Sequence, residues 1–529
     1  MRSLWLDTHP ITLPTSAQAQ PEHLSPGTHY DAVIAGAGIT GLTTAVLLAR
    51  AGKNVAVLEA RSVGAAATGN TTAKVSLLQG TVLSGIRSHQ GDDTLQAYVD
   101  GNREAQAWLL HYLDHRGVDY QHRTAYTYAT TAEGRSALEE EFQACRAAGV
   151  EAQWTEETEL PFPVTGALML EDQAQIHPMA LLQALVDELY ERGGVVLEGI
   201  RVTGVTGTDR RDVPLTVETT AGESSADQLS ADQLVISTGA PILDRGGYFA
   251  KLKGNRSYAL SFRLPAESRG QSPKGMYLSA DSPSRTTRTV PLPEGTDAGE
   301  ELLLVGGSDH VVGRARAQGY ASHQAAVDEL EAWTQEHFPG AQRTHAWAAQ
   351  DYRAGTAVPF MGALPRGGGD IYVATGFNKW GMTNGVAAAL ALSSELLHQD
   401  LGSGGTMPWA QTLMDTSLTG STLLTGLKDN LEVGGHLIGD WAQAELHSLP
   451  QDSPAEGEGR VGRKDGRPVA VSTVDGETCE LSAVCPHMGG ILTWNDAERS
   501  WDCPLHASRF SHDGTLLEGP AVNDLNPPR

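Results

Sequence analysis

A short apolar run, three spaced glycines and a helical pattern together constrain the fold of this chain most strongly. Residues 30–35 are rich in β-forming apolar side chains, and Gly36, Gly38 and Gly41 follow with the spacing G-x-G-x-x-G. Apolar residues then recur at helical spacing: Leu42, Ala45, Val46 and Ala49. The order strand, tight turn and helix is typical of a dinucleotide-binding unit.

Each of these glycines has a physical role in such a unit. We expect Gly36 to form the turn, Gly38 to let the backbone approach a pyrophosphate, and Gly41 to let the helix pack closely on the strand. The pyrophosphate binds where the helix N-terminus leaves N–H groups free. A second buried strand over residues 55–58 leads to Glu59, whose carboxylate we expect at the ribose hydroxyls. The alternative is a glycine-rich turn in an ordinary α/β unit.

Length and charge limit the classes of protein to which the chain can belong. The 529 residues are enough for two or three domains, and the formal net charge of −26 argues against nucleic acid or anionic membrane as partner. Residues 1–26 lack a basic segment followed by an apolar one, and no apolar run is long enough for a membrane span. A soluble, cytoplasmic protein is therefore expected.

Three further segments are expected around the cofactor. Residues 68–76 are small and polar, so this segment, Thr72 included, can lie against a flavin ring, although it could also be a surface loop. A buried strand over residues 233–238 ends at Gly239. A strand over residues 370–375 leads into a glycine-rich turn and a helix, which again offers N–H groups to a cofactor. Its candidate contacts are Gly376, Gly381, Met382 and Thr383.

The segments between these elements predict a second, inserted domain. Residues 92–116 and a following segment ending at Gly149 have helical patterns, and Cys145 lies on an apolar face, as expected for a core thiol. Residues 246–345 predict an antiparallel sheet over the cofactor. Three polar residues could face a substrate there, although surface or ion-paired positions are the more common ones for such residues: Arg285, Arg288 and His310.

The C-terminal part has a different pattern, with short strands and with Asp465-Gly466 and Asp475-Gly476 as hairpin turns. Within it, Cys485 and His487 are followed by Cys503 and His506, with the spacing C-x-H-x15-C-x2-H. One thiolate and one imidazole from each of two loops is the ligand set of a Rieske [2Fe-2S] cluster. Zinc is the weaker alternative, because structural zinc sites group like ligands together. Cys479 is expected in the core of this domain.

Both parts of the chain resemble known families. Residues 28–400 resemble the D-amino-acid oxidase and glycine oxidase superfamily, on the glycines named above, Glu59, the VISTGA strand and GFNKWGMT at 376–383. The segment CPHMGGILTWNDAERSWDCPLHASRF resembles Rieske domains fused to such oxidoreductases. The resemblance implies FAD, an iron-sulfur cluster, and oxidation of an amine or amino acid.

The chain also departs from these families. Gly490 and Leu505 stand where respiratory Rieske loops carry two further cysteines, and Phe510 stands at a frequent tyrosine position, whereas Ser508 keeps a hydroxyl. Fewer hydrogen bonds to sulfur predict a lower reduction potential than that of respiratory centres. Trp380 and Thr383 stand where related amine oxidases place a histidine and a lysine, so direct use of O2 is not expected.

The predicted architecture is an α/β Rossmann-type FAD domain with an inserted α+β substrate domain, followed by a small all-β Rieske domain. The expected units are an extension (1–27), the oxidoreductase domain (28–400, with FAD-binding parts near 28–80, 160–245 and 345–400 and substrate parts near 85–160 and 246–345), a linker (401–436) and the Rieske domain (437–529).

The predicted function is hydride transfer from an amine or amino acid to FAD, with electrons relayed through the cluster to an external acceptor. No catalytic base is assignable, and Arg285, His310 and Trp380 are candidate catalytic residues. The alternatives are an electron carrier or redox sensor without small-molecule turnover, and a reductase that receives electrons from a ferredoxin.

Overall fold

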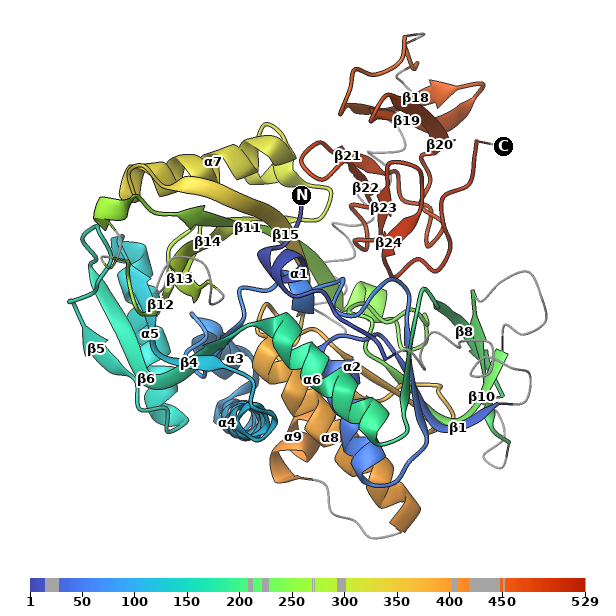
Figure 1. Cartoon of the computed structure of the whole chain (residues 1–529), viewed down its shortest axis with the longest axis horizontal. Helices are drawn as coiled ribbons and strands as arrows, with labels where there is room; N and C mark the ends of the chain where they lie inside the picture. The colour runs from blue at the N-terminus through green and yellow to red at the C-terminus, as the bar shows by residue number, and fades with distance from the viewer. Residues whose placement is uncertain are drawn as a thin grey trace.

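The computed structural model describes residues 1–14, 28–207, 213–220, 228–268, 270, 272–292, 301–401, 407–417, 448–450 and 452–528. Residues 15–27 of the expected extension, 402–406 and 418–436 of the expected linker, and 437–447 of the expected Rieske domain therefore lie outside the described residues. The described backbone forms two large sheets that share one core and two small sheets that form a separate C-terminal layer (Figure 1).

The first large sheet is mainly parallel and has the predicted dinucleotide-binding topology. Its strand order is β16-β17-β10-β1-β2-β7, with β8 and β9 continuing from β10. The strands are β1 (His29–Ala35), β2 (Val55–Glu59), β7 (Val195–Glu198), β8 (Val202–Thr206), β9 (Leu215–Thr219), β10 (Gln228–Ile236), β16 (Phe360–Ala363) and β17 (Ile371–Thr375). Three helices pack their apolar side chains against one face of this sheet: α2 (Ile39–Arg50), α6 (Pro178–Glu191) and α8 (Gly381–Leu401).

The second large sheet has the order β15-β11-β14-β13-β12-β4-β6-β3, with β5 paired to β6. Its strands are β3 (Lys74–Val75), β4 (Tyr120–Ala129), β5 (Gln153–Thr155), β6 (Gly166–Ile176), β11 (Leu252–Arg263), β12 (Met276–Ser279), β13 (Arg285–Pro291), β14 (Glu301–Val311) and β15 (Gln342–Ala354). The accompanying helices are α3 (Val82–Gln90), α4 (Asp92–Arg116), α5 (Ala132–Ala147) and α7 (His323–His337). The antiparallel sheet predicted over residues 246–345 is therefore present.

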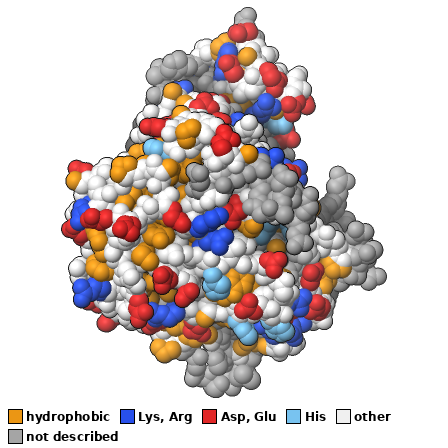
Figure 2. Space-filling view, turned by 60° about the vertical axis from the view of Figure 1, so that its left-hand side comes forward, with side chains coloured by type: hydrophobic (Ala, Val, Ile, Leu, Met, Phe, Trp, Pro, Cys, Tyr) orange, Lys and Arg blue, Asp and Glu red, His pale blue; other side chains and the backbone are white. Residues whose placement is uncertain are grey.

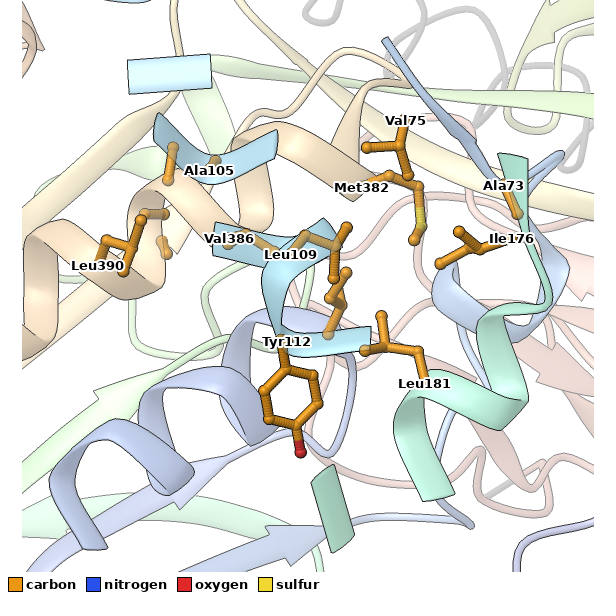
Figure 3. Close-up of a cluster of buried hydrophobic side chains, with 14 of the residues drawn as sticks. Ala73, Val75, Ala105, Leu109, Tyr112, Ile176, Leu181, Met382, Val386 and Leu390 are labelled. Atoms are coloured by element: carbon orange, nitrogen blue, oxygen red, sulfur yellow. The ribbon is translucent and has the colours of Figure 1, made fainter. Parts of the chain in front are cut away.

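Apolar side chains from several helices and from the second sheet meet in the core cluster of Figure 3. Helix α8 contributes Met382, Val386 and Leu390, and α4 contributes residues such as Leu109, while Val75 comes from β3. Met382 belongs to this cluster and to the glycine-rich turn region expected at the cofactor. The core therefore fixes the start of α8 relative to the second sheet.

Three expected boundaries differ from the structure. β6 and β15 pair within the second sheet, although residues 160–176 and 345–354 were expected in FAD-binding parts. The expected linker begins with helix α9 (Pro408–Ser417), which packs on α4, and Trp409 there donates to Glu104 Oε2 at 2.7 Å. Strand pairing and helix docking depend on distant partners, so local sequence patterns do not reveal them.

The N-terminal segment is also part of the core. Helix α1 (Leu4–Thr8) buries Leu4 and Trp5. Trp5 Nε1 donates to the Thr71 carbonyl at 2.7 Å, and Ser3 Oγ donates to the Gly69 carbonyl at 2.6 Å. No motif in residues 1–14 indicates this contact with the segment expected at the flavin.

The C-terminal domain holds two small antiparallel sheets. One consists of β18 (Gly459–Lys464), β19 (Arg467–Val474) and β20 (Glu477–Ser482), and the other of β21 (Thr493–Asn495), β22 (Ser500–Asp502), β23 (Arg509–Ser511) and β24 (Leu516–Glu518). The two predicted hairpin turns have positive φ at both central residues, as type I′ turns require. Cys145 is buried as predicted, whereas Cys479 is partly exposed on β20, so its assignment to the core was wrong.

The outer surface carries charges of both signs. Figure 2 shows acidic and basic side chains interspersed with apolar ones on the visible face. None of the helices in the described ranges is both long and apolar enough to cross a bilayer.

Candidate functional site

A long cavity lies where the two large sheets and the C-terminal domain meet. Its walls include the motif glycines Gly36 and Gly38, Thr72 from the small polar segment, and Gly239 after β10. Glu59 lines it as well. The structure therefore brings together residues that the sequence placed in four separate cofactor-binding elements.

The glycines of the motif are required by close backbone contacts. Gly36 has φ +105°, and a Cβ atom there would lie 2.7 Å from the Ser237 carbonyl oxygen. A Cβ on Gly41 would lie 2.0 Å from the Gly36 oxygen, so Gly41 acts in helix packing and does not itself line the cavity. Gly38 is the N-cap of α2 and adds no capping side chain, which leaves the helix N-terminus to an anionic group.

Glu59 stands at the end of β2, as predicted for a ribose ligand. Its Oε2 atom accepts from the Ala37 amide and its Oε1 atom accepts from the Arg61 amide, both at 2.9 Å. These bonds hold the carboxylate against the glycine turn. Each carboxylate oxygen keeps a second lone pair that can accept from a ribose hydroxyl.

The expected flavin contacts are divided between cavity and core. Gly376, Gly381 and Met382 line the cavity. Thr383 does not line it, because its hydroxyl is buried against Gln79 Nε2 at 3.2 Å. Trp380 lines the cavity and is nearly buried, so of the three candidate catalytic residues it is the one at the cofactor.

The other two candidates lie elsewhere. Arg285 is buried and pairs with Glu329, and His310 is buried beside Tyr258, with its Nδ1 atom 3.1 Å from the Ser308 carbonyl oxygen. Neither lines the cavity. Burial, followed by the charge of His323, lowers the pKa of His310 to about 4. Arg288, also considered for substrate contact, is buried over the Trp5 ring at 5.1 Å and donates to backbone carbonyls.

Two ionisable residues of the cavity wall, Lys74 and Asp351, belong to no motif in the sequence. Lys74 is buried, and its Nζ atom donates to the Tyr277 carbonyl at 2.6 Å and to Thr286 Oγ1. Burial, followed by repulsion from Arg288, lowers the pKa of Lys74 to about 7. Burial raises the pKa of Asp351 to about 7. A lone lysine within the small polar segment 68–76 was the available signal for Lys74.

The second site lies in the C-terminal domain, where two loops repeat one geometry. In each loop the cysteine N–H, of Cys485 or Cys503, donates to the carbonyl five residues later at 2.8 Å, and its own carbonyl accepts from the amide four residues later at 3.0 Å. The two thiols lie close enough to share a hydrogen bond. This hydrogen bond lowers the pKa of Cys485 and raises that of Cys503.

The two histidines lie on the same side of this pair. The His487 and His506 rings are 5.1 Å apart at 85°, and both have their rings against Phe249 of the first domain. His487 Nε2 lies 3.1 Å from Asp244 Oδ1, while its buried Nδ1 atom has no partner within the described ranges and is available to iron. Burial lowers the pKa of His506 to about 4, which keeps it neutral, as a metal ligand must be.

The donor set fits the predicted cluster. Among the described residues, no three Cys, His, Asp or Glu side chains form a group that could hold one metal ion. A Rieske centre takes only two protein ligands for each iron, two cysteines on one and two histidines on the other. Two loops that each supply one cysteine and one histidine meet this requirement. All four cysteines are free, and Gly490 lies against Leu505 with no room for a larger side chain. Ser508 hydrogen-bonds the Cys485 sulfur through its side chain.

Direct bonds join the cavity wall to the cluster loops. Gln350 and Tyr352 of β15 both line the cavity. Gln350 Nε2 donates to the carbonyl of Ala507, the residue after His506, at 2.9 Å, and the Tyr352 ring belongs to the same small apolar cluster as Ala507. Two residues of one strand thus contact both sites.

Comparisons with known proteins agree with this arrangement. The model of the family described as FAD dependent oxidoreductase matches residues 31–395, and the Rieske [2Fe-2S] domain model matches residues 447–528. The chain is 29% identical to the Rieske 2Fe-2S iron-sulfur protein YhfW of Bacillus subtilis over 510 residues, 95% of this chain and 94% of YhfW.

Solved structures show the same fold for the first domain. Glycine oxidase from Geobacillus kaustophilus aligns with a TM-score of 0.54 and 18% identity, over 70% of this chain and 95% of that one. L-proline dehydrogenase from P. horikoshii aligns with a TM-score of 0.55 and 16% identity, over 72% of this chain and 95% of that one.

Proposed function

Because the chain belongs to the FAD-dependent oxidoreductase family and carries a Rieske [2Fe-2S] domain, we propose that it oxidises an amine or amino acid and passes the electrons through the cluster to an external acceptor. The observation that carries this proposal is that Gln350 and Tyr352 line the cofactor cavity and also contact Ala507 of a cluster loop. Two redox sites joined by one strand suit a relay within one molecule.

The substrate class is supported by the fold relatives. The similar solved structures include a glycine oxidase, an L-proline dehydrogenase and an L-amino acid deaminase from Proteus vulgaris, all named for amino-acid chemistry. We place the substrate between the start of α8 and the second sheet, where Trp380 and Lys74 line the cavity.

The two cofactors divide the chemistry, since FAD accepts a hydride from a carbon beside nitrogen and the cluster accepts electrons singly. The chain's own residues position and deprotonate the substrate. Lys74, with two N–H groups donated to Tyr277 and Thr286, keeps its lone pair for a proton when neutral. It is therefore our candidate to take a proton from a substrate ammonium group, which a hydride donor must lose. The candidate cluster ligands are Cys485, His487, Cys503 and His506.

An anaerobic screen tests this proposal. The protein carrying both cofactors is mixed with amines and with D- and L-amino acids, and the flavin and cluster absorption bands are followed together. We expect at least one compound to bleach the flavin band first and the cluster band afterwards. The Cys503→Ala variant, which loses a cluster ligand, should show flavin bleaching alone.

The alternatives give different results in the same screen. An electron carrier or sensor would respond to chemical or protein reductants and to no compound of the panel. A ferredoxin-fed reductase would show the cluster band bleaching before the flavin band when reduced ferredoxin is the donor. Either result would contradict the proposed direction of electron flow.

A further inference from the structure

The C-terminal domain supplies part of the wall of the cofactor cavity. Leu517, Glu518 and Gly519, at the end of β24 and just after it, line the same cavity as the motif glycines. These residues lie outside the segment that the FAD dependent oxidoreductase family model matches. The cavity is therefore completed by a segment that does not belong to the oxidoreductase domain.

This segment lies at the end of the cavity where Glu59 stands. Arg201 lines the cavity and donates from Nη2 to the Leu516 carbonyl at 2.8 Å. Burial lowers the pKa of Arg201, and the charges that act on it are those of Asp524, Arg61 and Glu59. Arg201 thus connects β24 to the Glu59 end of the cavity, the end that suits the ribose of the adenosine half of FAD.

Buried bonds keep the segment in place. Arg256 of β11, 3% exposed, forms a two-pronged ion pair with Glu498 and approaches Glu518 Oε1 at 3.5 Å. Tyr352 donates to the Gly519 carbonyl at 3.1 Å. Away from the cavity, Asp496 Oδ1 accepts from the amides that begin α7, at 2.9 and 3.2 Å. The position of the cavity wall therefore depends on how the C-terminal domain is docked.

We propose that Leu517–Gly519 forms part of the FAD site at its adenosine end, so that FAD binding and docking of the C-terminal domain stabilise each other. A ligand that contacts two domains must favour their docked state, and the docked state must in turn bind the ligand more tightly by the same factor. The inference rests on FAD as the cofactor and not on the identity of the substrate.

The direct test places a charge in the wall. The variant Leu517→Asp sets a carboxylate facing the anionic cofactor, and we expect its FAD dissociation constant to rise about tenfold or more. The measurement is quenching of flavin fluorescence when FAD is added back to the full chain after its removal. Thr515→Asp is the matched control, because Thr515 is exposed on the same segment and does not line the cavity, and it should bind FAD as the wild type does.

The linkage is tested by weakening the docking without touching the cavity. Glu498 does not line the cavity, and it pairs with Arg256 of the first domain and with Arg509 of its own domain, so Glu498→Gln weakens the docking pair from outside the cavity. We expect its FAD dissociation constant to rise by about 5- to 150-fold, the usual range of coupling between sites. Asp496→Ala, which loses the α7 contacts, should act in the same direction and serves if Glu498→Gln folds poorly or loses the cluster spectrum.

The control for this test is Glu480→Gln, which loses an ion pair with Lys464 inside the C-terminal domain and should leave FAD binding unchanged. By reciprocity, FAD should slow proteolytic release of the C-terminal domain in the wild type, and less so in Glu498→Gln. A wild-type dissociation constant in Leu517→Asp, or in the docking variant, overturns the proposal. Because no substrate is used, this outcome is independent of the anaerobic screen.

Discussion

Gly41 illustrates how a single missing side chain permits a cofactor site. A Cβ atom at this position would lie 2.0 Å from the Gly36 oxygen and 2.7 Å from Ser237 Oγ, and the Gly36 carbonyl, as backbone of the turn, cannot move away cheaply. Gly41 does not line the cavity, yet the distance between α2 and the turn depends on it.

The variant Gly41→Ala should therefore lose FAD, because α2 must shift away from the turn that holds the pyrophosphate. We expect the free energy of unfolding to fall by about 1–3 kcal/mol, as for other overpacked sites. Gly85→Ala is the control: Gly85 lies in α3 with no atom near its Cβ position, so alanine should stabilise the protein by up to about 1 kcal/mol and leave FAD bound. Denaturant titration and flavin content measure both effects.

Lys74 predicts a pH dependence of stability. Its pKa is lowered to about 7 in the folded protein from the ordinary lysine value of 10.5, so between these values the unfolded chain binds a proton that the folded chain does not. The free energy of unfolding should therefore rise with pH in this window, by up to about 1.4 kcal/mol per pH unit from this group. In Lys74→Met that contribution should vanish.

The measurement compares urea unfolding of wild type and Lys74→Met between about pH 7.5 and 9.5, above the window in which Asp351, with its pKa raised to about 7, titrates. Parallel stability curves for the two proteins would show that Lys74 keeps its charge on folding. In that case it would be unsuited to accept a substrate proton at neutral pH.

At the scale of elements, local patterns predicted those parts of the fold that local interactions determine. The helix over residues 92–116 and the strand, turn and helix around Gly36 follow from periodicity and from turn chemistry. Helices α1 and α9 were missed because these short segments become helical here by burying a few residues, such as Trp5 and Trp409, against distant partners. The assignment of β6 and β15 to the second sheet depends on long-range pairing in the same way.

The same limit applies to the site. Residue spacing in the sequence predicted both the glycine-rich turn at 36–41 and the two loops at 485–506, because each segment carries its own recognisable motif. The contacts of Phe249 and Asp244 with the cluster histidines cannot be predicted in this way, since these residues lie more than two hundred positions away and have no motif of their own. Contacts of this kind follow from docking of one domain on another.

Helix α1 should support the loop at the cofactor. Trp5 is 1% exposed and donates to the Thr71 carbonyl, and Ser3 donates to Gly69 in the same loop. We expect Trp5→Ala to lower the free energy of unfolding by about 3–5 kcal/mol and to weaken FAD binding as well. Trp154→Ala, at a half-buried tryptophan of β5, should reduce stability without changing FAD affinity. Equal FAD affinities in both variants would contradict a role for α1 at the cofactor.

At the scale of the whole molecule, the docking of the C-terminal domain determines how electrons can move. His487 and His506 face Phe249 of the first domain, and both side chains are nearly buried. The histidine side of the cluster site is therefore turned toward the first domain, which also carries the cofactor cavity. Exchange between the two centres then needs no encounter between separate molecules.

Salt provides a test of this fixed arrangement. Ion pairs between exposed groups are screened at high ionic strength, whereas buried pairs are screened much less. The Arg256–Glu498 pair at the domain interface has side chains 3% and 12% exposed, so the interface should persist in concentrated salt. Electron equilibration between flavin and cluster after rapid photoreduction should be first-order, independent of protein concentration, and nearly unchanged when NaCl is raised from about 0.05 to 0.5 M. Transfer to an external protein acceptor should instead depend on its concentration. A steep fall of the internal rate with salt would mean that the domains separate and meet again during each transfer, as mobile carriers do.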